Sequence, residues 1–140
     1  MDESTSLYRE TLLDHARHPR RSGTLDQPDL VGTAHNPLCG DQVRLTVALN
    51  GERIEDIRGA VRGCVIAQAS CSLMAELVAG KSLGEARTLG GAFREALEGS
   101  SDTLAPGLET LSPLLEVRRH RSRAGCALLA WEALAQAHKA

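Results

Sequence analysis

Three cysteines and one aspartate are the residues of this chain best suited to metal or sulfur chemistry. Cys39 and Asp41 stand in Asn-Pro-Leu-Cys-Gly-Asp, Cys64 in Gly-Cys-Val-Ile-Ala-Gln-Ala-Ser, and Cys126 in Arg-Ala-Gly-Cys-Ala-Leu-Leu-Ala-Trp. Three thiolates and a carboxylate make a four-coordinate set that suits zinc or iron–sulfur chemistry. A carboxylate is a weaker partner for a soft ion than a fourth thiolate, so the set predicts a site that can be opened.

The predicted elements explain how these four residues could meet. Cys64 comes where a strand gives way to a helix, and Cys126 falls in the first turn of the last predicted helix. Helix starts stabilise anions, so we expect both thiols to have lowered pKa values. Cys39 and Asp41 flank Gly40 on a loop, where glycine permits a tight backbone and both side chains can point to one spot.

Spacing alone leaves a purely structural interpretation open. A lone buried cysteine is usually a small hydrophobic residue, and the familiar Cys-x-x-Cys pair is absent. Cys71 lies seven residues after Cys64, about two helical turns on, too far from the helix start to join the site. We therefore predict a structural role for Cys71.

The histidines and one basic run offer weaker candidates. We expect His15 to be packed or to cap a helix, His18 and His138 to face solvent, and His35 to lie near the Cys39 loop. The basic run of residues 118–123 is either a solvated loop, a docking patch, or charge that helps to hold the last cysteine ionised.

Composition limits the classes of function. With 140 residues the chain can bury a core as a single domain, residues 1–140, and its net charge of −2 predicts no binding to nucleic acid. No stretch approaches the ~20 apolar residues of a membrane span. The acidic start Met1-Asp2-Glu3-Ser4 lacks the features of a secretory signal, so we expect a reducing, cytoplasmic location.

Helical periodicity predicts helices at about residues 5–17, 66–80 and 123–138. Ser82-x-x-Glu85 is a capping-box pattern that starts another short helix, and residues 92–97 are again helical. Residues 98–113 are expected to form a looser connection with an apolar underside.

The middle of the chain predicts strands. Apolar residues occupy every second position of one run: Val43, Leu45, Val47 and Leu49. Asn50-Gly51 follows as a hairpin dipeptide and leads into a second strand at residues 57–61, while residues 31–35 form a third. The expected fold is α+β, a small antiparallel three-stranded sheet packed on one face by helices, with helices at both ends of the chain.

Several motifs together resemble the U-type iron–sulfur cluster assembly proteins, whose fold is SufE/IscU-like. The matching residues, in the family's order, are Leu7-Tyr8-Arg9, Asp14-His15, Pro19, Val31-Gly32, Asn36 to Asp41, Gly63-Cys64, Ala69-Ser70, Ser72, Met74, Cys126 and Trp131. The resemblance extends over about residues 7–134. An ordered series of motifs over nearly the whole chain is more specific than any one of them.

Within this family the chain is more similar to SufU than to the IscU scaffolds. IscU-type proteins have a His-Cys pair at the last cysteine and a Leu-Pro-Pro-Val-Lys loop before it, whereas here Arg123-Ala124-Gly125 precede Cys126. Residues from about 89 to 120 resemble an insertion that SufU-type proteins carry. Two positions depart from the family pattern: Cys71 stands where a small residue is usual, and Gly125 where a bulkier one is.

The resemblance implies zinc held by Cys39, Asp41, Cys64 and Cys126, and a zinc-dependent sulfurtransferase activity in iron–sulfur cluster biogenesis. It implies that a SufS-like, pyridoxal-phosphate cysteine desulfurase supplies persulfide sulfur, that Cys39 accepts it, and that Arg123 assists. A downstream iron–sulfur scaffold is the implied receiver. The loop position of Cys39 suits an acceptor that must leave the metal better than the helix-anchored cysteines do.

Two other functions fit the same residues. In one, the protein is an assembly scaffold whose four ligands hold a transient iron–sulfur cluster. In the other, it is a structural zinc protein that serves as an interaction module. The missing His-Cys pair and the insertion favour sulfur transfer over the scaffold.

Overall fold

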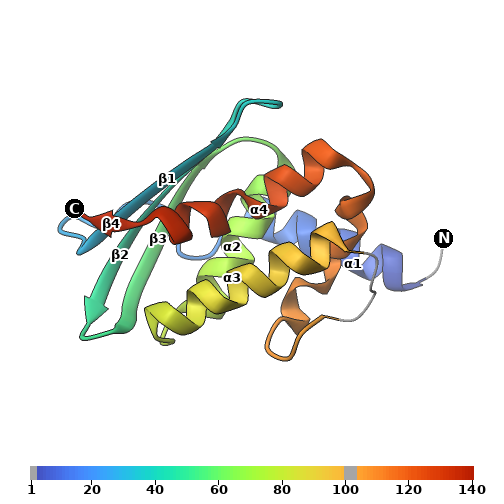
Figure 1. Ribbon diagram of the computed structural model, residues 1–140. Helices are drawn as coiled ribbons and strands as arrows, with labels where there is room; N and C mark the ends of the chain where they lie inside the picture. Colours follow the sequence, from blue (N-terminus) through green and yellow to red (C-terminus); the bar gives the residue numbers. More distant parts are fainter. Residues whose placement is uncertain (1–2, 100–103) are drawn as a thin grey trace.

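An antiparallel sheet covered by helices on one face forms the framework of the protein (Figure 1). The computed structural model describes residues 3–99 and 104–140, with side chains from residue 7 onward. The strands lie in the order β3–β2–β1–β4 and comprise β1 (Leu30–Asn36), β2 (Asp41–Asn50), β3 (Arg53–Arg62) and β4 (His138–Lys139). The helices are α1 (Glu3–Arg17), α2 (Val65–Val78), α3 (Leu83–Glu98), the 3-10 helix η1 (Glu109–Arg119) and α4 (Arg121–Gln136). The predicted α+β class is confirmed.

The prediction of three strands is wrong, because the C-terminus adds a fourth. β4 is two residues long and pairs antiparallel with Leu30 and Val31 at the edge of β1. The sequence predicts that the last helix continues to His138, but α4 ends at Gln136 and the chain turns onto the sheet. Two residues are too few to show a periodic pattern, and their partner strand exists only in the folded protein.

Alternating apolar residues build the buried face of β2, as predicted. The side chains of Val43, Leu45 and Val47 are almost fully buried beneath the helices. The predicted Asn50-Gly51 turn joins β2 to β3, and Gly51 has a φ of +64°, which glycine adopts without steric cost.

The helices form two layers over the sheet. α4 packs on β1 and β2, and α2 packs on β3, while α1, α3 and η1 pack on those two helices (Figure 1). Fully buried side chains from the strands, α2, α3, η1 and α4 meet in one core, which includes Leu45, Ile57, Met74, Phe93, Leu111 and Leu129. This core fixes the positions from which α2 and α4 present their first turns.

Local sequence features set several helix ends. α2 stops before Gly80, which has a φ of +86°. The predicted capping box is present, because the backbone N–H of Glu85 donates to Ser82 Oγ at 3.1 Å. The two helical pieces predicted after Ser82 are one continuous helix, α3.

The connection predicted for residues 98–113 is more ordered than its composition indicates. Residues 100–103 lie outside the described residues, as do Met1 and Asp2 of the predicted acidic start. After them, the side chains of Leu108, the N-cap of η1, and Leu111, within η1, are both fully buried in the core. The predicted apolar underside of this connection is confirmed.

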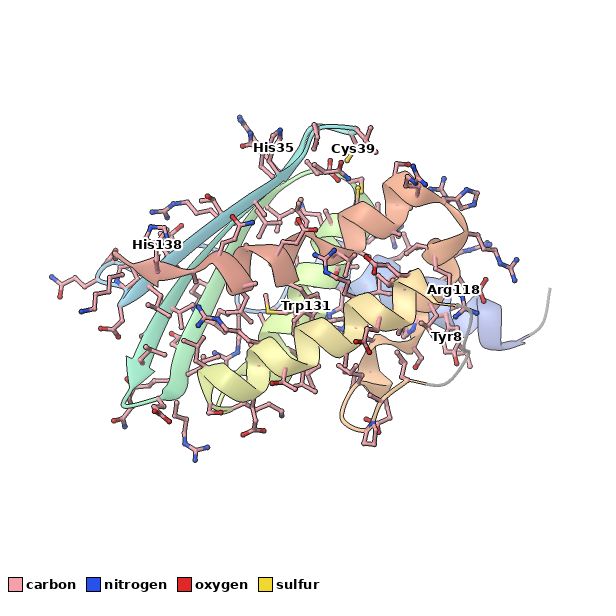
Figure 2. All side chains as sticks on the ribbon, viewed as in Figure 1. Tyr8, His35, Cys39, Arg118, Trp131 and His138 are labelled. Atoms are coloured by element: carbon pink, nitrogen blue, oxygen red, sulfur yellow. The ribbon has the colours of Figure 1, made fainter. Side chains whose placement is uncertain are left out.

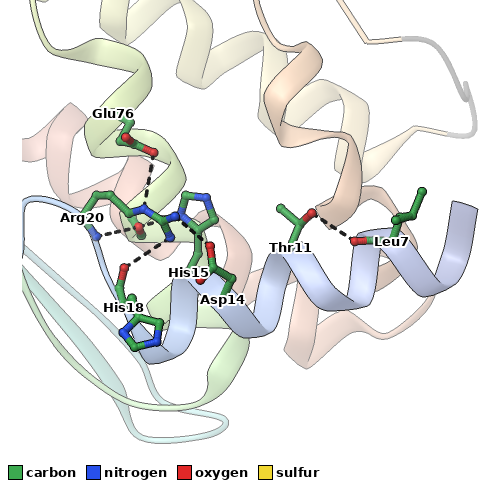
Figure 3. Close-up of polar contacts among 8 residues, drawn as sticks. Leu7, Thr11, Asp14, His15, His18, Arg20 and Glu76 are labelled. Carbon is green, nitrogen blue, oxygen red and sulfur yellow. Dashed lines mark hydrogen bonds and ion pairs between the residues drawn. The ribbon is translucent and has the colours of Figure 1, made fainter.

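A polar cluster joins α1 to α2 (Figure 3). His15 is buried, its Nδ1 lies 2.7 Å from Ser72 Oγ, and that hydroxyl accepts a hydrogen bond from the backbone N–H of Arg20 at 2.9 Å. The Arg20 guanidinium pairs with Asp14 at 2.7 Å and with Glu76 at 4.0 Å. Burial lowers the pKa of His15, and the Arg20 charge lowers it further, which favours the neutral imidazole. The predicted packed role of His15 is confirmed.

Candidate metal centre

Cys39 lies in the tight turn that joins β1 to β2. The register pairs Asn36 with Asp41, so residues 37–40 form the turn, and the Asn36 carbonyl accepts hydrogen bonds from the N–H groups of Cys39 at 3.3 Å and Gly40 at 2.8 Å. Gly40 has a φ of +76°, a conformation that side chains disfavour. The hairpin projects beyond the helices, and the Cys39 side chain is exposed at its tip (Figure 2). The predicted loop position of Cys39 is confirmed.

The fold brings Cys126 of α4 directly against this turn. The Sγ atoms of Cys39 and Cys126 lie 3.0 Å apart, and both thiols are free. One ligand atom from each of Cys39, Asp41 and Cys126 lies within 4.8 Å of the others. Three of the four predicted ligands, from two distant segments, therefore form one cluster.

Cys64, the fourth predicted ligand, stands at the margin of the cluster. It is the N-cap residue of α2 and is exposed, and its sulfur is not within 4.8 Å of all three other ligand atoms. Its thiol nevertheless interacts with the Asp41 carboxylate and with the Cys126 thiol, and its backbone N–H also interacts with the carboxylate.

One carboxylate oxygen of Asp41 lies within 4.8 Å of the sulfur atoms of Cys39 and Cys126. The side chain is 5% exposed, and its Oδ2 accepts no hydrogen bond from the described residues. A buried carboxylate oxygen without a donor is costly unless a cation or an ordered water satisfies it. Together with the neighbouring thiols, this oxygen fits a zinc-type donor set of sulfur and carboxylate ligands.

The glycine before Cys64 makes room for the carboxylate. A Cβ atom at Gly63 would lie 2.5 Å from Asp41 Cγ and 2.7 Å from its Oδ1, closer than non-bonded atoms can approach. Any side chain at this position would displace Asp41. The pair Gly63-Cys64 therefore supplies a thiol and the space for a neighbouring ligand at once.

The expectation of lowered thiol pKa values is wrong for both helix-borne cysteines. Burial raises the pKa of Cys64, and the Asp41 carboxylate raises it further, although the backbone N–H of Ala67 at the start of α2 opposes them. Burial also raises the pKa of Cys126, with further contributions from Cys39 and Asp41. α4 begins at residue 121, so Cys126 lies beyond the first turn, where a helix terminus stabilises an anion.

Asp41 behaves in the opposite way. Burial raises the pKa of its carboxyl group, but interactions with the thiols of Cys64 and Cys126 and with the backbone of Cys64 outweigh burial and lower it. The protein groups thus favour an ionised Asp41 carboxylate beside the protonated thiols of Cys64 and Cys126. A bound cation would reverse the preference of the thiols, because a metal ion stabilises the thiolate.

Asn36 is a site residue that sequence reasoning missed. Its Nδ2 donates to the carbonyl of Ser122 at 3.3 Å and to Cys126 Sγ at 3.5 Å, while its Oδ1 accepts from the N–H of Leu38 at 3.0 Å. A Cβ atom at Gly125 would lie 2.9 Å from that Nδ2. The sequence offered one clue, since Gly125 is one of the two positions where the chain departs from the family pattern.

Arg123 and three of the histidines are exposed to solvent. Arg123 is exposed in the first turn of α4, three residues before Cys126. His18, His35 and His138 are exposed, and Figure 2 shows His35 at the same end of the sheet as the Cys39 turn. The predictions for His18 and His138 are confirmed.

Cys71 is a core residue, as predicted. It is 4% exposed on α2 and packs against Gly59 of β3. Burial raises its pKa to about 12, and no polar group contributes to that shift.

A groove on the described surface lies apart from the three cysteines of the cluster. It has a volume of about 800 Å³ and is lined by residues 33–35, 42–44 and 60–62 of three strands, with Glu132 and Gln136 of α4. None of these residues is a cysteine. Of the clustered cysteines, Cys39 and Cys64 are exposed, and each has an exposed apolar neighbour in the chain: Leu38, which is 70% exposed, and Val65, which is 46% exposed.

Comparison with known proteins gives the family. The family described as NifU-like N terminal domain matches residues 7–140. The chain belongs to this family. It is 34% identical to the zinc-dependent sulfurtransferase SufU of Bacillus subtilis over 92% of this chain and 87% of the relative. It is 38% identical to the iron–sulfur cluster assembly scaffold protein IscU of Streptococcus pyogenes over 95% of this chain and 83% of the relative.

Solved structures of NifU-like proteins share the fold. The N-terminal part of a nitrogen-fixing NifU-like protein from Brucella abortus has a TM-score of 0.84 at 28% identity, covering 96% of this chain and 93% of that one. FiSufU, a SUF-system protein from Fervidobacterium islandicum, has a TM-score of 0.80 at 27% identity, covering 94% and 96%. The predicted family of iron–sulfur cluster assembly proteins is confirmed. Within residues 3–99 and 104–140, no helix is long and apolar enough to cross a membrane.

Proposed function

We propose that this protein is a zinc-dependent sulfurtransferase that accepts persulfide sulfur from a cysteine desulfurase for iron–sulfur cluster biogenesis. The observation that carries the proposal is an exposed thiol inside a cluster of metal-type ligands. Cys39 is solvent-exposed on a projecting turn, yet its sulfur lies 3.0 Å from that of the buried Cys126. The similarity to a Bacillus subtilis protein named for this activity supports it.

The proposed zinc ligands are Cys39, Asp41, Cys64 and Cys126. The unpartnered Asp41 Oδ2 and the clustered thiols support this set, and Cys64 joins it through its interactions with Asp41 and Cys126. When bound, zinc would hold the thiols as thiolates at neutral pH.

Cys39 is the proposed sulfur acceptor. Its thiolate attacks the outer sulfur of a persulfide on the partner enzyme, a new S–S bond forms at Cys39, and the bond between the partner's two sulfurs breaks. The partner cysteine leaves as a thiolate, so charge and atoms balance as in thiol–disulfide exchange. The attacking thiol must be accessible, and Cys39 is exposed whereas Cys126 is 3% exposed.

Arg123 and the apolar rim are proposed to assist the encounter. Arg123 is exposed one helical turn before Cys126, and its guanidinium makes no ion pair within the described part of the chain. A fixed positive charge there would stabilise negative charge on the sulfur in transit. The exposed Leu38 and Val65 beside the thiols suit contact with a protein that carries the persulfide.

The test measures desulfurase turnover with a SufS-type enzyme, free cysteine and purified protein. Wild type is expected to stimulate turnover strongly, Cys39→Ala to abolish stimulation, and the matched control Cys71→Ala to retain it. Stimulation by Cys39→Ala equal to wild type would eliminate the acceptor role. It would leave the structural zinc interaction module as the better description, provided that the variant remains folded.

The second candidate is an assembly scaffold that holds a transient iron–sulfur cluster on the same four ligands. The 38% identity to the Streptococcus pyogenes IscU scaffold favours it. Elemental analysis discriminates between the candidates: zinc without iron supports sulfur transfer. Anaerobic reconstitution of a stable cluster that passes to an acceptor protein, with no zinc in the native sample, supports the scaffold.

Residues 89–120 are proposed to be the insertion of the sulfurtransferase branch. They comprise the second half of α3 and all of η1, and several of their leucines belong to the common core. A downstream iron–sulfur scaffold is the proposed recipient of the sulfur.

A further inference from the structure

Asn36 is the point at which the Cys39 turn and α4 are tied together. It is the last residue of β1 and is 7% exposed. Its backbone carbonyl accepts the N–H groups of Cys39 and Gly40, and its Oδ1 accepts the N–H of Leu38. Three hydrogen bonds from the turn to this one residue therefore fix the conformation that presents Cys39.

The other end of the same amide reaches α4. Nδ2 lies 3.3 Å from the carbonyl oxygen of Ser122 and 3.5 Å from Cys126 Sγ, within hydrogen-bonding range for sulfur. An amide N–H that donates to a cysteine sulfur orients it and stabilises negative charge on it. Cys126 is thus buried and held by the amide, whereas Cys39 is exposed and its sulfur accepts no hydrogen bond from this amide.

Gly125 leaves the space that the Asn36 amide needs to reach Cys126. A Cβ at this position would stand 2.9 Å from Asn36 Nδ2, so the amide would have to shift away from the sulfur. Glycine is a poor helix former and costs about 1 kcal/mol relative to alanine inside a helix. Its presence in the second turn of α4 is explained by the space that it leaves for the amide.

We propose that Asn36, with Gly125 as its matching space, is a positioning residue that anchors Cys126 as the fixed ligand of the site and sets how tightly the site holds its metal. This inference rests on the proposed function, because it requires that the cluster binds zinc. It assigns different roles to two neighbouring thiols: Cys126 is anchored by an amide and a helix, and Cys39 is the one that can leave.

The test measures zinc affinity by competition with a chromophoric chelator, without any desulfurase. Asn36→Ala and Asn36→Asp are compared with wild type, and both are expected to bind zinc about 10- to 100-fold more weakly, the usual effect of removing a partner of a ligand. Asn36→Asp retains an acceptor for Leu38 but cannot donate to sulfur. It therefore separates the sulfur contact from the turn contact.

Ser70→Ala is the matched control. Ser70 is also buried and also bonds to α4, but its hydroxyl donates to the carbonyl of Ala127 and not to a sulfur. This variant is expected to lower the melting temperature and to leave zinc affinity unchanged. Equal loss of zinc affinity in Ser70→Ala and Asn36→Ala would show that both act only through the fold, and would overturn the inference.

Gly125→Ala perturbs the contact from the other side. Alanine favours the helix, so a purely structural account predicts a more stable protein with unaltered zinc affinity. The proposal predicts weaker zinc binding without a loss of stability in the metal-free protein. If Gly125→Ala and Asn36→Asp both bind zinc as tightly as wild type, the role of Asn36 is overturned and the proposed function stands. If wild type itself binds no zinc, the proposed function is overturned as well.

Discussion

Cys126 and Cys71 are equally hidden from solvent but differ in what surrounds them. Their exposed fractions are 3% and 4%. Cys126 has the Cys39 sulfur at 3.0 Å, the Asn36 amide at 3.5 Å and the Asp41 carboxylate nearby, whereas only burial raises the pKa of Cys71. Burial alone therefore does not distinguish the proposed ligand Cys126 from the core thiol Cys71. The distinguishing feature of Cys126 is its set of polar neighbours, which includes groups that could coordinate a cation.

Metal removal should give the largest difference between the surroundings of Cys126 and those of Cys71. Structural zinc sites contribute on the order of 10 kcal/mol to folding, so a strong chelator is expected to lower the melting temperature of wild type sharply. Cys71→Ala should show the same drop, because its site is intact. Cys126→Ala should melt at the same temperature with and without chelator in differential scanning calorimetry. A wild-type melting temperature that ignores the chelator would contradict a zinc site at the cluster.

The next largest effect is expected in the zinc content of the Cys126→Ala and Cys71→Ala variants. Cys126→Ala is expected to abolish zinc binding, whereas Cys71→Ala should retain about one zinc ion per chain, since four-coordinate sites rarely survive the loss of a thiolate. Inductively coupled plasma mass spectrometry of the purified variants measures this. The contrast drawn between the two thiols fails if Cys71→Ala loses its metal while remaining folded.

Packing around Cys71 offers a sharper test of its role in the core. A Cβ at Gly59 would overlap Cys71 Sγ, so Gly59→Ala should destabilise the protein by about 1–3 kcal/mol, as overpacking usually does. Zinc content should not change. The double variant Gly59→Ala, Cys71→Ala should recover most of the lost stability, because the alanine at 71 frees the space. Urea unfolding of wild type, the two single variants and the double variant measures the free energies of unfolding. Losses of stability that simply add in the double variant would refute the packing role.

The smallest expected effect appears at alkaline pH. A pKa of about 12 for folded Cys71, against a usual value of 9.0, means that the unfolded chain releases this proton first. The unfolded state then binds fewer protons, so unfolding free energy falls as pH rises above 9, by up to about 1.4 kcal/mol per pH unit. Cys71→Ala should lack this component. Identical pH dependence for wild type and variant between pH 8 and 10 would contradict the buried thiol.

Much of the fold is predictable because it depends on near neighbours in the chain. The alternation along β2, the Asn50-Gly51 turn and the Ser82 cap each arise within a few residues, and each is present. β4 was not predictable, because two residues show no pattern and their pairing needs the finished edge of β1.

The candidate site also has features that could be predicted from the sequence and features that could not. The types of the proposed ligands and the loop position of Cys39 follow from the sequence. The raised pKa values of Cys64 and Cys126 do not, because burial and the nearby carboxylate outweigh any helix start. The contact between Asn36 and Cys126 joins residues 90 positions apart, and no local pattern reports it.

The amino-acid sequence by itself determined which chemical groups are available and which short segments become strands, turns and helices, since these depend on side-chain chemistry and local backbone preference. The tertiary structure alone decided which groups meet: it set Cys39 and Asp41 against Cys126, left Cys64 at the margin and enclosed Cys71 in the core. The physical reason is that distances and desolvation across the molecule arise only when the helices pack on the sheet.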